Sequence, residues 1–152
     1  MIKINKIRSS FFEIISFLDK NNIKYWVGRG LVEMIANKLI EDEPVKHDID
    51  FHVLHQDSKR LLKFLQLEGY EIKNSKDYKI QILGKSDNRR IEFVFLFPEG
   101  NRFLYHKDKG QKFSCPKELF GNESIIIKDA KVKIPSPPKN YLECIYPEYE
   151  KS

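Results

Sequence analysis

The feature that most constrains the fold of this chain is the run Arg89–Phe97 near its middle, Arg-Arg-Ile-Glu-Phe-Val-Phe-Leu-Phe. Successive side chains of a strand point to opposite faces, and after the two arginines both sets of positions are apolar apart from Glu92. A strand that is apolar on both faces is typical of the centre of a sheet. A carboxylate in such a strand is costly unless it is paired or binds a metal, so Glu92 is a candidate functional residue.

A second strand-like run, His47–Leu54, carries two carboxylates two positions apart. Alternation places Asp48, Asp50 and His52 on one face and three apolar side chains on the other, toward the core. Like charges that close destabilise a strand unless a positive group lies between them, and oxygen ligands suit Mg²⁺ (or Mn²⁺). A metal site is one interpretation of the acid pair. A strand edge whose acids face water, balanced by nearby lysines and arginines, is the other.

A glycine turn precedes the acid pair. The run Ile23–Val27 is typical of a short strand, and Leu31–Ile40 has the apolar spacing of a helix. Between them lie Gly28, Arg29 and Gly30. Glycines allow backbone N–H groups to approach a phosphate, and the helix dipole favours an anion there. These three residues are therefore candidate phosphate-binding residues, with a tight turn and a solvent-exposed arginine as the simpler alternative.

Length and composition limit the remaining possibilities. With 152 residues, the chain fits one domain, in which we expect an N-terminal helix (1–22), a core with the turn and acid strands (23–97), and a C-terminal hairpin and helix (98–152). The net charge of +5 suits an anionic ligand such as a nucleotide, but genome composition explains it equally well. Binding to nucleic acid would rest on this charge alone and is not expected.

Cysteine usage and hydropathy bear on the compartment. Cys115 and Cys144 form no C-x-x-C pair, and no signal peptide precedes them. No window approaches the roughly 20 apolar residues that are needed to cross a bilayer. We expect a cytoplasmic protein with free thiols and no membrane span.

If the acid-bearing strands are neighbours, Glu92 joins Asp48 and Asp50 in a cluster that can hold one or two Mg²⁺ ions. Such ions neutralise phosphate charge and bring a hydroxyl nucleophile in line with phosphorus. The glycine turn, then Asp48-Ile49-Asp50, then Glu92 resembles the pattern of the nucleotidyltransferase superfamily. The chain departs from that pattern where Arg29 separates the two glycines.

The C-terminal part resembles a particular branch of that superfamily. The segments 113–120 and 134–149 are similar to the tail of LicD/fukutin-type phosphotransferases, although Pro147-Glu148 replaces a glycine-aspartate close. The superfamily resemblance implies an α/β (α+β) nucleotidyltransferase fold, with a small mixed β-sheet and helices packed mainly on one face.

The resemblance also implies an activity and residue roles. Asp48 and Asp50 would bind Mg²⁺, and Glu92 would complete the metal site or act as general base. The LicD branch implies transfer of a substituted phosphate, such as phosphocholine, from a CDP-linked donor to a sugar hydroxyl. The wider superfamily implies transfer of a nucleoside monophosphate from an NTP to a small molecule such as an aminoglycoside or lincosamide. A degenerate, non-catalytic domain that binds nucleotides or regulates a partner is the alternative.

Overall fold

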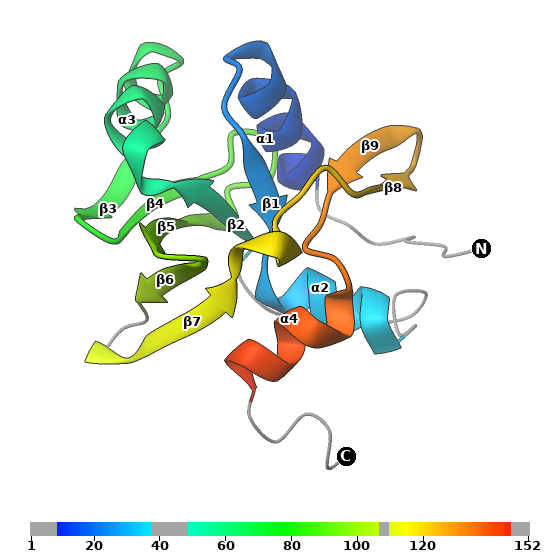
Figure 1. The fold of residues 1–152 in the computed structure, drawn as a ribbon. Coiled ribbons are helices and arrows are strands. Elements are labelled where there is room, and N and C mark those ends of the chain that lie inside the picture. Colours follow the sequence, from blue (N-terminus) through cyan, green and yellow to red (C-terminus); the bar gives the residue numbers. More distant parts are fainter. Residues whose placement is uncertain (1–8, 38–48, 107–109, 147–152) are drawn as a thin grey trace.

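The computed structural model describes residues 9–37, 49–106 and 110–146 (Figure 1). Short helical turns at His55–Asp57 and Lys117–Leu119 join some of its elements. The helices and strands are α1 (Ser9–Lys20), β1 (Tyr25–Val27), α2 (Arg29–Asn37), β2 (Ile49–Leu54), α3 (Ser58–Leu67), β3 (Ile72–Lys76), β4 (Lys79–Leu83), β5 (Arg90–Glu99), β6 (Arg102–His106), β7 (Lys112–Pro116), β8 (Ser124–Ile127), β9 (Ala130–Lys133) and α4 (Pro138–Ile145).

The apolar run that the sequence places at the centre of a sheet forms β5, and β5 is central. Within the described residues, one sheet has the strand order β1-β2-β5-β4-β3, and β6 and β7 extend it from the far half of β5. The β2–β5 pair is parallel, and the other pairs are antiparallel. The mixed sheet and the α+β class are therefore confirmed.

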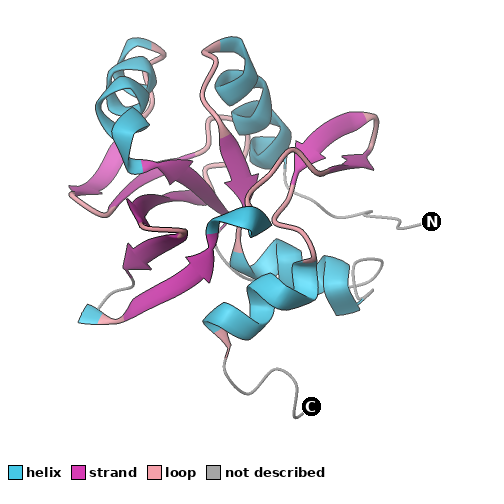
Figure 2. Cartoon of the chain, viewed as in Figure 1, coloured by secondary structure: helices cyan, strands magenta, loops and turns pink. Residues whose placement is uncertain are grey.

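Side-chain alternation divides the core between the two faces of this sheet. Phe51 and Phe93 point to one face, which α1, α3 and the β8–β9 hairpin cover. Val94 and Leu96 point to the other face, where they pack with residues of α2, α4, β6 and β7. Figures 1 and 2 show α1 and α3 side by side beyond one face, and α2 and α4 together beyond the other. The helices are thus shared more evenly between the two faces than the sequence led us to expect.

The second face is built largely by the C-terminal part of the chain. Strand β7, which the sequence analysis did not anticipate, pairs with β6 and carries the buried Cys115. Helix α4 packs beside α2 and β7 and buries Tyr141, Leu142 and Ile145. In the described part of the chain, no helix is long and apolar enough to span a membrane.

The start of α1 is anchored to the turn between β4 and β5. The Ser10 hydroxyl donates a hydrogen bond of 2.8 Å to Asp87 Oδ2, and the backbone N–H groups of Lys85 and Ser86 donate to the Glu13 carboxylate. Gly84 lies under this contact, and a Cβ atom added there would overlap with Ser10 Cβ. The turn can approach the helix this closely because residue 84 has no side chain.

This close approach generates the first prediction. Gly84→Ala should lower the free energy of unfolding by about 1–3 kcal/mol, because either the backbone of the turn or the start of α1 must shift to admit the methyl group. Urea denaturation of the purified chain measures the change. Gly121→Ala is the matched control, since a Cβ added at Gly121 meets nothing within 4 Å. Equal effects of the two substitutions would contradict the role assigned to the contact.

Candidate functional site

The parallel pairing of β2 and β5 brings two of the predicted acids together. Asp50 lies directly opposite Glu92 in the register of the two strands, and both side chains are half-buried. Directly paired positions place side chains on the same face of a sheet, as the sequence analysis expected. Asp48, the third predicted acid, lies outside the described residues. In the described part of the chain, no group of three acid, His or Cys side chains is placed to hold a metal ion.

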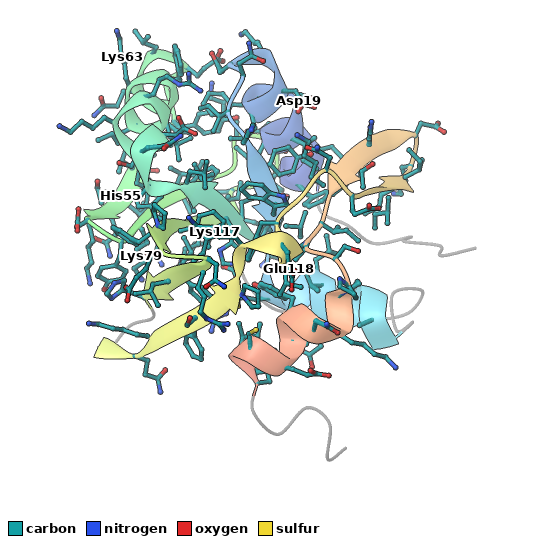
Figure 3. All side chains as sticks on the ribbon, in the orientation of Figure 1. Asp19, His55, Lys63, Lys79, Lys117 and Glu118 are labelled. Carbon is teal, nitrogen blue, oxygen red and sulfur yellow. The ribbon has the colours of Figure 1, made fainter. Side chains whose placement is uncertain are left out.

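The Glu92 carboxylate is held by two side chains of the neighbouring strand β4. Lys79 Nζ lies 3.4 Å from Glu92 Oε1, and the lysine side chain is only 4% exposed. Lys79 is labelled in Figure 3. Gln81 Nε2 donates a hydrogen bond of 3.2 Å to Glu92 Oε2. Buried lysines are rare unless they are paired, so Lys79 offsets the charge of Glu92 and fixes the carboxylate beside Asp50.

Sequence reasoning missed Lys79, although its signal was present. In the alternating run of β4, Lys79 and Gln81 fall on one face, and Ile80 and Ile82 fall on the other, where they join the core. The register that puts Gln81 opposite Glu92 comes only from the structure. The sequence signal for the ion pair is a lysine in one strand and a glutamate in an otherwise apolar strand. This signal identifies Lys79 as the partner of Glu92 only when the pairing of β4 with β5 is known.

The glycine turn ends β1 and begins α2 beside the acid pair. The Gly28 N–H donates a hydrogen bond of 2.9 Å to the Asp50 carbonyl oxygen, which ties the turn to β2. Arg29 begins the helix with a φ of 43°, a left-handed conformation that is uncommon for residues other than glycine. Arg29, which departs from the superfamily pattern, thus has a backbone conformation that glycine adopts more easily than other residues do.

The two glycines of the turn differ in their surroundings. A Cβ atom on Gly28 would lie 3.0 Å from His52 Nε2 and 3.3 Å from the Tyr141 hydroxyl, whereas one on Gly30 would meet nothing within 4 Å. The absence of a side chain at Gly28 is therefore explained by packing inside the protein. Open space surrounds Gly30, which leaves it the position that a ligand could approach.

His52 lies on the acid-bearing face but is fully buried. Its Nε2 atom lies 2.6 Å from the Tyr141 hydroxyl. Burial lowers the pKa of His52 to about 3, so the ring is neutral at pH 7. Because no part of the ring is exposed, its contribution to the site is structural, and direct contact with a substrate does not fit this position.

Tyrosines from the C-terminal part complete the surroundings of the turn. The Arg29 N–H donates a hydrogen bond of 3.1 Å to the Tyr141 hydroxyl. Burial raises the pKa of Tyr146, and the nearby Arg29, with which Tyr146 also forms a hydrogen bond, opposes the rise. Arg29, Tyr146 and Asp50 are close enough to interact electrostatically. The structure thus brings the predicted residues 28–30, Asp50 and Glu92 into one region and adds Lys79 and Tyr141 to it.

Comparison with known proteins identifies the family. The model of a family described as aminoglycoside-2''-adenylyltransferase matches residues 10–143. An uncharacterized protein of Rickettsia prowazekii (strain Madrid E) is 29% identical over 143 residues, which cover 88% of this chain and 51% of that protein. An uncharacterized protein of Rickettsia typhi (strain ATCC VR-144 / Wilmington) is 29% identical over 141 residues, which cover 88% and 43%. The chain spans about half the length of these curated relatives.

Solved structures confirm the nucleotidyltransferase fold. The lincosamide antibiotic adenylyltransferase LnuA, with lincomycin bound, has a TM-score of 0.63 and 17% identity, over 91% of this chain and 85% of that one. ANT(2'')-Ia in complex with adenylyl-2''-tobramycin has a TM-score of 0.62 and 14% identity, over 92% and 75%.

These findings correct the resemblance to the LicD/fukutin branch, which was wrong below the level of the superfamily. The C-terminal segments that suggested it form β7, the short helical turn after it and α4, and residues 147–149 lie outside the described residues. The aromatic side chains of Phe113, Phe120 and Tyr141 belong to the core on the second face of the sheet. Such a pattern reflects packing that many folds share, and it does not distinguish one branch from another. The acid pattern was the informative part, and the family match spans it: the chain belongs to the aminoglycoside-2''-adenylyltransferase family.

Proposed function

We propose that this chain transfers an adenylyl group from ATP to a hydroxyl group of a small-molecule acceptor of the aminoglycoside or lincosamide type. The observation that carries the proposal is the pairing of Asp50 with Glu92 beside the glycine turn, in a chain of this family. The acceptor class is taken from two structural neighbours, the lincosamide adenylyltransferase LnuA with lincomycin bound and ANT(2'')-Ia with adenylyl-2''-tobramycin.

The proposed transfer forms one P–O bond and breaks another. The acceptor oxygen attacks the α-phosphorus of ATP, and a new P–O bond forms while the bond from that phosphorus to the bridging oxygen of the β-phosphate breaks. Pyrophosphate leaves, and the acceptor hydroxyl gives its proton to a base. Glu92 is the candidate base, because Lys79 and Gln81 each engage one of its oxygens and hold the carboxylate beside Asp50. A base that is fixed in this way needs little reorganisation when the proton moves.

The donor atoms of this region fit a magnesium ion. Asp50 and Glu92 present carboxylate oxygens from directly paired positions, and Mg²⁺ prefers such hard oxygen ligands together with substrate phosphates. Asp48 and Asp50 would hold the ion, with Glu92 either as a further ligand or as the base. When bound, Mg²⁺ would offset phosphate charge and polarise a phosphoryl oxygen. Gly28, Arg29 and Gly30 would lie on the phosphate side, with Arg29 supplying a positive charge.

Asp50 provides the direct test of the enzyme proposal. Asp50→Asn should lower kcat/KM for adenylyl transfer by at least about 100-fold, because it removes a charged oxygen ligand from the reaction centre. Turnover is followed as ATP-dependent pyrophosphate release in the presence of Mg²⁺ and a panel of aminoglycosides and lincosamides. Asp57→Asn, just beyond the end of the same strand, is the matched control and should leave turnover unchanged. If wild type and both variants bind nucleotide without turnover, the chain is a binding module and the enzyme proposal fails.

Glu92 has two candidate roles that one substitution can separate. Glu92→Gln should lower kcat by about 10²–10⁴-fold, the usual contribution of a positioned acid or base. The affinity for Mn²⁺, measured in the presence of a non-hydrolysable ATP analogue, is unchanged if Glu92 is the base and falls if Glu92 is a ligand. Glu99→Gln, an exposed position on the same strand, should leave both quantities unchanged. Wild-type turnover by Glu92→Gln would exclude both roles.

The ion pair predicts a stability effect that does not depend on activity. Lys79→Met should lower the free energy of unfolding by about 3 kcal/mol at pH 7, because it leaves a largely buried carboxylate without its cation. The double variant Lys79→Met, Glu92→Gln should recover most of that loss, since no uncompensated charge remains. Urea denaturation measures both, with the exposed Lys76→Met as control, expected within about 0.5 kcal/mol of wild type. Strictly additive losses in the double variant would show that the pair is not coupled.

A further inference from the structure

The hydroxyl group of Tyr141 connects three segments that are far apart in the sequence. It accepts a hydrogen bond of 3.1 Å from the backbone N–H of Arg29, in the glycine turn. It also lies 2.6 Å from His52 Nε2, on β2. Both Tyr141 and His52 are fully buried, so water does not compete for the hydrogen bond between them, and the bond from Arg29 is part-buried. Helix α4 therefore reaches the candidate site through a single polar group.

The direction of the hydrogen bonds follows from their partners. The other ring nitrogen of His52, Nδ1, lies 3.4 Å from the carbonyl oxygen of Val94, and a carbonyl can only accept. Nδ1 is therefore assigned the proton, and the Tyr141 hydroxyl, which accepts from the Arg29 N–H, donates its own proton to Nε2. One chain of donors and acceptors thus runs from Arg29 through Tyr141 and His52 to Val94, two residues beyond Glu92 on the central strand.

The conformation of the turn must be stabilised by contacts from other parts of the chain, because Arg29 has an unfavourable backbone conformation. The left-handed φ of 43° at this residue is strained for a side chain with a Cβ atom, and such conformations persist only where the surroundings fix them. The hydrogen bond from the Arg29 N–H to the Tyr141 hydroxyl is one contact that fixes this conformation. The close approach of His52 and Tyr141 to Gly28, at 3.0 and 3.3 Å from an added Cβ, shows that the turn is fitted around the same pair.

We propose that Tyr141 is a positioning residue of the nucleotide site: its hydroxyl, oriented by His52, holds Arg29 in the left-handed conformation and so fixes the turn that receives the donor phosphates. The inference rests on the proposed function, because it deepens the role of the same turn. It makes α4, from the C-terminal part of the chain, necessary for nucleotide affinity although α4 carries none of the proposed catalytic groups.

The chain offers a matched control for the test. Tyr105 is also fully buried, and its ring centroid lies 4.9 Å from that of His52. In the part of the chain that the structure describes, the Tyr105 hydroxyl is buried without a hydrogen-bond partner. Tyr105→Phe therefore removes the same atom from the same cluster without breaking a hydrogen bond. In contrast, Tyr141→Phe leaves the buried His52 Nε2 and the part-buried Arg29 N–H without their partner.

The experiment has one readout with nucleotide and one without. In the full chain, Tyr141→Phe should weaken binding of a non-hydrolysable ATP analogue about tenfold by calorimetry, and Tyr105→Phe should change it less than twofold. Without nucleotide, hydrogen exchange of the Arg29 amide, followed by NMR, should be at least about tenfold faster in Tyr141→Phe than in Tyr105→Phe. If Tyr141→Phe does not fold, His52→Phe, which removes the acceptor of the Tyr141 hydroxyl and keeps an aromatic ring, should change both readouts in the same direction.

A second set of variants, made in a chain that carries Arg29→Gly, distinguishes a positioning role of Tyr141 from a general effect on packing. Glycine adopts a positive φ without strain, so in the R29G background the effect of Tyr141→Phe on nucleotide affinity should fall below twofold. An undiminished tenfold effect in that background, or equal effects of Tyr141→Phe and Tyr105→Phe, would overturn the proposal. If the wild-type chain binds no nucleotide, the proposed function fails, and Arg29 exchange still decides the positioning role: faster exchange in Tyr141→Phe supports it, and equal exchange in the two variants overturns it.

Discussion

The parallel pairing of β2 with β5 is the constraint on which the rest of the structure depends. Parallel neighbours need a crossover connection, which α3 and the β3–β4 hairpin supply between the two strands. The register sets Phe51 opposite Phe93 on one face, where their rings stack at 5.9 Å, and Asp50 opposite Glu92 on the other. A slip of one residue would exchange the faces of a whole strand and move its acid into the apolar core. Burial of the aromatic core therefore also holds the acids together.

The sequence predicted those features that depend on a single strand. Period-two alternation in β2 and β5 assigned Asp50 and Glu92 to faces without any knowledge of their neighbours, and the aromatic run located the central strand. It could not assign Lys79, whose contact with Glu92 depends on how β4 pairs with β5, nor Tyr141, which lies 112 residues from its Arg29 partner. Pairing between strands and contacts of high sequence separation are set by the whole fold, so short patterns carry little information about them.

The same distinction explains why the superfamily was predictable and the branch was not. Paired carboxylates at a fixed spacing are demanded by phosphate and metal chemistry, so the acid pattern narrows the function. The aromatic residues of the C-terminal part are required by packing: Phe120 and Tyr141 fill the face of the sheet opposite α1, around His52. Many proteins bury a helix against a sheet in this way, and a resemblance built on such residues points to a common requirement of folding more than to a shared substrate.

Arg29 is the residue that most clearly departs from the superfamily pattern, and on sequence alone it leaves the alternative of a degenerate site open. The structure changes the weight of that argument. The residue has a left-handed backbone conformation, which glycine adopts without strain, and two buried side chains, Tyr141 and His52, support it. A strained conformation of this kind persists only where its surroundings fix it, and here Tyr141 and His52 do so. The arginine therefore adds a positive charge to a turn whose shape is held by buried side chains, which supports the proposed phosphate site.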